Sequence, residues 1–75
     1  MATKTYYWDF FGPRALGMAE HFARHTAEFL DKNGVLGCSI DTLSETEGHH
    51  AARCVAPELA WSVIEGSLRP KRAVG

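Results

Sequence analysis

A run of aromatic residues near the N-terminus constrains the fold more than any other feature of this sequence. Residues 3–11, TKTYYWDFF, hold five aromatic residues in six positions, preceded by threonines that favour extended backbone. Alternation along a strand places Tyr6, Trp8 and Phe10 on one face and the side chains between them on the other. Because both faces carry large rings, we expect this strand to lie inside a sheet or against a second chain.

A helical pattern follows, from Pro13 to about Asn33. Gly12-Pro13 ends the strand, and proline suits the first position of a helix. The opposite end carries Asn33-Gly34, a typical stop signal. One helical face is apolar, and the other carries charges spaced four residues apart, namely Glu20, Arg24, Glu28 and Lys32. We therefore predict one long amphipathic helix with its charged face in solvent.

The second half of the chain predicts two antiparallel strands and a second helix. The segments CSIDTL, residues 38–43, and HHAARCVA, residues 49–56, are joined by the polar hairpin sequence SETEG. Pro57-Glu58 then opens a helix that Pro70 ends. We expect residues 69–75 to be a frayed basic tail, and residues 1–75 to form a single domain.

The predicted order βαββα describes an α+β fold, a small two-layer sandwich with both helices on one face of an antiparallel or mixed sheet. This arrangement resembles a truncated ferredoxin-like unit, since the complete ferredoxin-like order βαββαβ has one more strand. The other sheet face is then bare, and exposed rings on it indicate a partner. We predict a small binding or interaction module that forms a homodimer through Tyr6, Trp8 and Phe10.

The sequence contains four histidines in 75 residues, which suggests a second hypothesis, a metal-binding protein. His21 and His25 stand one helical turn apart, a spacing that occurs in helical metal sites. His49 and His50 point to opposite sides of their strand, and we expect His50 to approach the helix. The candidate zinc ligands are therefore His21, His25 and His50, or Cys38 in place of one histidine. The sequence lacks an HExxH motif, and such boundary histidines are more often structural.

A nucleic-acid accessory protein is the third reading, because exposed aromatic rings can stack on bases. The first 68 residues hold five basic and nine acidic side chains, a balance of −4 that repels phosphate. Basic charge gathers only in the tail, at Arg69, Lys71 and Arg72. The charge balance therefore argues against nucleic acid as a partner.

The sequence presents no recognisable catalytic constellation, so it does not support an enzyme, although the metal-binding hypothesis includes a metal-dependent enzyme as well as a metal carrier. We expect no cofactor beyond the candidate zinc ion. Cys38 and Cys54 lack an evident neighbouring base, and burial would raise the pKa of a thiol. Asp9 lies among aromatic residues and would need a partner there, either Arg53 or Arg14. Without a partner it would be the best general-base candidate in the chain.

The expected location is the cytoplasm. No apolar run approaches the roughly 18 residues that cross a bilayer, so we expect no membrane association. The start MATKTYY lacks the basic-then-apolar layout of a signal peptide. The two cysteines are accordingly expected to be reduced thiols.

Overall fold

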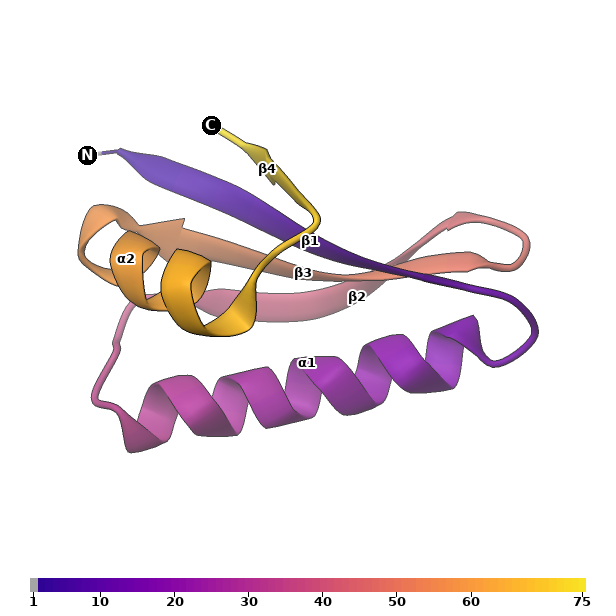
Figure 1. Ribbon diagram of the computed structural model, residues 1–75, viewed down its shortest axis with the longest axis horizontal. Helices are drawn as coiled ribbons and strands as arrows, with labels where there is room; N and C mark the ends of the chain where they lie inside the picture. The colour runs from indigo at the N-terminus through magenta and orange to yellow at the C-terminus, as the bar shows by residue number, and fades with distance from the viewer. Residues whose placement is uncertain (1) are drawn as a thin grey trace.

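The computed structural model describes residues 2–75, which form one four-stranded sheet with helices on one side (Figure 1). The main elements are β1 (Thr3–Phe11), α1 (Ala15–Lys32), β2 (Ser39–Thr46), β3 (His49–Pro57) and β4 (Arg72–Val74). Between β3 and β4 the chain makes three consecutive helical turns, the 3₁₀ turn η1 (Glu58–Ala60), α2 (Trp61–Val63) and the wider π-type turn η2 (Ile64–Leu68). Within residues 2–75, no helix is long and apolar enough to cross a membrane.

The sheet is antiparallel throughout and has the strand order β2-β3-β1-β4. Strand β3 pairs with all of β1, from Pro57 opposite Thr3 to His49 opposite Phe11. The prediction of an α+β two-layer fold is confirmed. Strand β4 adds the sixth element, so the chain has the complete ferredoxin-like order βαββαβ rather than the truncated one.

Strand β4 also corrects the expectation that residues 69–75 fray. Arg69 adopts a left-handed conformation, with φ 48°, where the chain turns after η2. The amide of Lys71 then donates to the carbonyl of Tyr7 at 2.9 Å, and Arg72 bonds to Asp9 on the neighbouring strand. A three-residue strand leaves no alternating pattern for the sequence to reveal, so only its tertiary partners define it.

The core lies between the sheet and the helices, and we call the sheet face toward α1 the inner face. Tyr6 has no exposed surface and Trp8 is 5% exposed. The Trp8 ring lies 5.0 Å from the ring of Phe22 on α1, and its Nε1 donates to the carbonyl of Leu68 at 2.8 Å. The small residues of β3 on this face are also buried, which lets α1 approach closely: Ala52, Cys54 and Ala56.

The predicted interface residues therefore have a different place in the structure. Tyr6 and Trp8 are covered by helical turns of their own chain, and Phe10 is half-buried with its ring 5.8 Å from that of Phe22. Burying the larger row of rings beneath the helices removes the most apolar area from water. The face left without helices, which we call the outer face, carries Tyr7, Asp9 and Phe11 instead.

Helix α1 and the helical turns after β3 cover the inner face unequally. Helix α1 has 18 residues, a length of about 27 Å, whereas the turns from Trp61 to Leu68 extend only about 12 Å at the same rise. These turns lie over the first half of β1, where Glu65 accepts hydrogen bonds from Lys4 and Tyr6. Figure 1 shows α2 at one end of the sheet, with α1 continuing alone toward the other end.

Replacing Trp8 with alanine should lower the free energy of unfolding by about 3–5 kcal/mol, because the change opens a cavity and leaves the Leu68 carbonyl without its donor. Urea denaturation followed by circular dichroism measures the change. Phe11, on the same strand but 66% exposed, is the matched control, and Phe11→Ala should cost less than about 1 kcal/mol in the monomer. Similar losses in the two variants would mean that the strand faces are assigned incorrectly.

Candidate functional site

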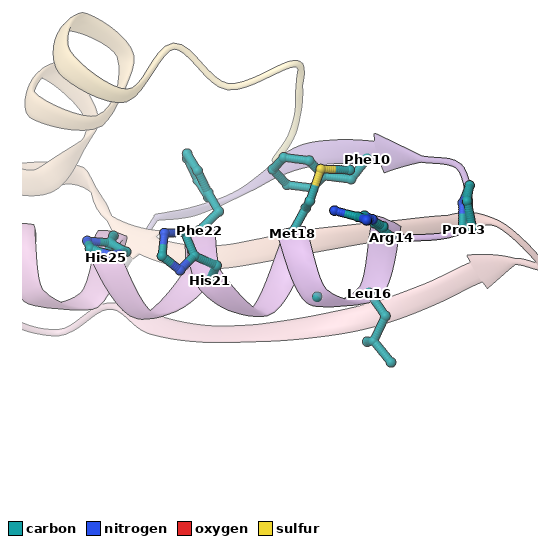
Figure 2. A pocket seen from close by; sticks show the side chains of 9 residues that line it. Phe10, Pro13, Arg14, Leu16, Met18, His21, Phe22 and His25 are labelled. Carbon is teal, nitrogen blue, oxygen red and sulfur yellow. The ribbon is translucent and has the colours of Figure 1, made fainter.

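A groove with a volume of about 970 Å³ runs along the flank of α1 that faces α2 (Figure 2). Its floor is apolar and consists mainly of Phe10, Phe22 and Met18, the last of which is 41% exposed. Figure 2 shows Met18 and Phe22 rising from α1 on the side of Phe10, whereas Leu16 points away from them. Apolar floor area that stays in contact with water is typical of a binding surface.

Three basic side chains border this groove. Arg14 lies one turn before Met18, while His21 and His25 follow along the same flank, since residues four apart are neighbours on a helix. The two imidazole rings are 4.3 Å apart between centroids, and both residues are exposed. The groove therefore joins an apolar floor to a rim of cationic and hydrogen-bonding groups.

The structure brings together only two of the three predicted zinc ligands, His21 and His25. His50 lies on the inner face of β3 opposite Phe10, whereas His21 and His25 lie on the groove flank of α1 rather than on the side that packs against β3. The Nδ1 atom of His50 is buried and has no hydrogen-bond partner within residues 2–75. Cys38 lies near Cys54 instead. In the part of the chain that the structure describes, these residues do not form a three-ligand group.

A different set of ligand-type side chains meets on the outer face. Ligand atoms of Asp9, Glu45 and His49 lie within 4.8 Å of one another. Arg72 already occupies this cluster, since its Nη2 donates to Asp9 at 2.6 Å and to Glu45 at 2.7 Å, and its Nε donates to Asp9 at 2.9 Å. His49 Nε2 lies 2.9 Å from the Asp9 carboxylate. The guanidinium thus supplies the positive charge that a metal ion would otherwise bring.

The partners of Asp9 differ from those expected from the sequence. Arg53 lies opposite Tyr7 and pairs with Asp41 on β2, with its Nε 2.9 Å from the carboxylate, so it is not free to reach Asp9. Arg72 comes from the segment expected to fray, which is why sequence reasoning missed it. One sequence feature could have pointed to Arg72. Asp9 is a carboxylate within an aromatic strand, and burying it requires a basic partner from a neighbouring strand.

The electrostatics of the cluster make Asp9 a poor general base. The hydrogen bonds from Arg72 hold the pKa of the Asp9 carboxyl below its usual value, and His49 adds to this effect, although burial opposes it. A carboxylate with a lowered pKa stays ionised and takes up a proton less readily. The cluster is therefore suited to joining β1, β2 and β4 rather than to proton transfer.

Neither cysteine is suited to nucleophilic chemistry. Burial raises the pKa of the Cys54 thiol to about 12, as expected for a mid-strand cysteine among small apolar neighbours. Burial also raises the pKa of Cys38. Both thiols are therefore protonated at neutral pH.

No protein-family model, curated protein or solved structure matches this chain. The groove and the outer face are therefore the features on which a function can be based.

The pH dependence of stability should report the Asp9 network. Because the folded pKa of Asp9 lies below its unfolded value of about 3.9, the network stabilises the fold above that pH, and this contribution is lost as the pH falls through the folded pKa. We expect Asp9→Asn to cost about 1–2 kcal/mol at pH 7 and much less near pH 3, measured by urea unfolding. Asp31→Asn, an exposed change on α1, should have little effect at either pH. A loss from Asp9→Asn that is equal at both values would contradict this account.

The double substitution His21→Gln and His25→Gln should change the free energy of unfolding by less than about 0.5 kcal/mol, because both side chains are exposed. Thermal unfolding with added zinc and with a chelator provides the measurement. A chelator-sensitive loss of stability in the wild type that disappears in the variant would instead assign a metal to this pair.

Proposed function

We propose that this protein is a small binding module that acts as a homodimer, with two copies packed through the outer faces of their sheets. The observation that carries the proposal is the one-sided placement of the helices, since nothing in residues 2–75 covers the outer face (Figure 1). Two apolar side chains of this face are largely in solvent, Phe11 at 66% and Val74 at 61% exposed. Exposed rings and aliphatic groups on a sheet favour burial against a partner.

The charges of the outer face support a second copy as the occupant. Arg72 pairs with Asp9 and Glu45, and Arg53 pairs with Asp41, so both signs occur together and largely neutralise each other. A two-fold dimer brings each surface against itself, which requires a self-complementary pattern. A face of mixed sign meets that requirement, whereas a face of one sign would repel its copy.

The size of the sheet is also adequate. Four strands spaced about 4.8 Å apart, with the longest rising about 30 Å, present roughly 500 Å² of flat area per copy. Side chains roughen this surface, so the accessible area that two copies bury approaches the lower range of stable interfaces, about 600 Å² per partner. The homodimer is therefore expected to be concentration-dependent.

The zinc-binding and nucleic-acid-binding hypotheses receive less support from these surfaces. Arg53 and Arg72 bond to carboxylates rather than presenting free cations to phosphate, and a zinc ion at Asp9 would have to displace Arg72. The thiols of Cys38 and Cys54 are unpaired, which supports the reducing cytoplasm as the location that we propose.

Sedimentation velocity at protein concentrations from about 10 µM to 1 mM tests the homodimer, a range that covers weak and moderate association. We expect the wild type to approach twice the monomer mass and Phe11→Glu to remain monomeric, because a charge would have to be buried at the interface. Leu36→Glu, at an exposed leucine outside the strands, is the matched control and should still dimerise. A wild type that stays monomeric throughout, or equal dissociation of both variants, would refute the proposal.

A further inference from the structure

We propose that the groove beside α1 is a docking site for an acidic amphipathic helix of another protein. The groove lies beside α1, on the helical side of the sheet. It is therefore separate from the outer face on which the homodimer proposal rests. Its position, the spacing of its side chains and its charge each point to this occupant.

The position of the groove corresponds to a shortfall in the helical layer. Helix α1 continues beside Phe10, but the turns that end at Leu68 cover only the other half of β1. Within residues 2–75, the chain passes from η2 to β4 without placing a helix alongside the first half of α1 (Figure 1). A helix from a partner would complete the layer there.

The side chains on the groove flank are spaced for helix packing. Arg14, Met18 and Phe22 follow one another at intervals of four, and His21 and His25 form a second such row. Rows of this kind are the ridges between which a neighbouring helix inserts its own side chains. From residue 14 to residue 25 the helix rises about 17 Å, enough for roughly three turns of a partner helix.

The floor between these rows can adapt to an inserted side chain. The Phe10 and Phe22 rings form a fixed base, with their centroids 5.8 Å apart and Phe22 packed on Trp8. Met18 is exposed, and its flexible thioether fills irregular space, as at other helix-binding surfaces. Apolar side chains at every third or fourth position of a partner helix match this floor.

The charge of the groove selects an acidic partner. Arg14, His21 and His25 line it, and no carboxylate of residues 2–75 does; Glu28 lies beyond the end, 3.7 Å from His25. Neutral and protonated imidazoles both donate hydrogen bonds to carboxylates. A second copy docking through the same flank would bring Arg14 against its own copy and would supply no carboxylate from the groove lining to pair with it, so self-association is disfavoured here.

The shape of the groove favours a helix over a small molecule. Drug-sized ligands bind in concave sites that bury about 70–90% of their surface. This groove is open to solvent, and Figure 2 shows Met18 and Phe22 on the side of Phe10 while Leu16 points away from them. An open groove that is long enough for three turns of a helix instead matches a partner helix that keeps its polar side in water.

A pair of synthetic peptides tests the proposal. The first is an amidated peptide of about 14 residues with leucines at helical spacing and glutamates on both flanks, and the second has lysine at every glutamate position. In a titration followed by amide chemical shifts of the ¹⁵N-labelled protein, we expect the acidic peptide to bind with a Kd on the order of 10–100 µM. The shifts should concentrate between Phe10 and His25, and the lysine peptide should bind at least ten-fold more weakly.

Variants of the protein test separately how the apolar floor and the basic rim contribute to peptide binding. Met18→Glu should weaken binding of the acidic peptide at least ten-fold, and Arg14→Glu, at an exposed position, should reduce the preference for the acidic over the lysine peptide. Leu59→Glu changes an exposed leucine outside the groove and should bind the acidic peptide as the wild type does. Circular dichroism confirms that each variant is folded.

Three results would overturn the proposal. Equal binding of the two peptides would show that the groove does not select acidic partners. Chemical-shift changes that concentrate on the outer face would show that the peptide binds there and not in the groove. Binding of decanoate in the groove, at a concentration below that of micelles, without binding of the acidic peptide would assign the groove to a small anionic ligand. None of these outcomes depends on whether the protein is a dimer.

Discussion

The packing of Trp8 is the interaction on which the rest of this structure depends. Its ring rests against Phe22 of α1, and its indole nitrogen donates to the last carbonyl of η2 at Leu68. One side chain of β1 therefore connects the sheet to both α1 and η2. In a chain of 75 residues, where only about 60% of the unfolded surface is buried, a single ring of this size is a large part of the core.

This packing determines what the two sides of the sheet can do. With the larger rings turned inward, the outer face keeps Tyr7, Phe11 and a network of paired charges centred on Arg72. On the inner side, the turns that end at Leu68 are short, so Phe10 stays only half-buried and one flank of α1 stays in contact with water. Both proposed binding surfaces thus follow from the same division of aromatic residues between two faces.

The sequence predicts the fold well because its signals are local. Alternation in residues 3–11, the 3.6-residue period after Pro13 and the hairpin before His49 identify the three longer strands and α1 to within a few residues. Two parts differ from the prediction. The single helix expected from Pro57 to Pro70 consists of three short turns between Glu58 and Leu68. Strand β4 is too short to show a period and is defined by Arg72 reaching Asp9. Tertiary partners, rather than local preference, form this last strand.

The candidate sites are less predictable because they depend on which face turns inward. Alternation separates Trp8 from Tyr7, but both rows contain rings, so the pattern does not determine which one meets the helices. The spacing of His21 and His25 correctly predicts their proximity, since it is a local property of a helix. The place of His50 depends on the helix–sheet packing, which spacing along the chain does not specify.

The most direct test of this account is an isotope-filtered NOE experiment on a sample that mixes labelled and unlabelled chains. We expect Trp8 to show contacts to the Phe22 ring within one chain, and we expect contacts between chains to come from outer-face side chains such as Phe11. Contacts of the Trp8 indole that cross from one chain to the other would contradict this account, because they would place this ring at an interface rather than in the core.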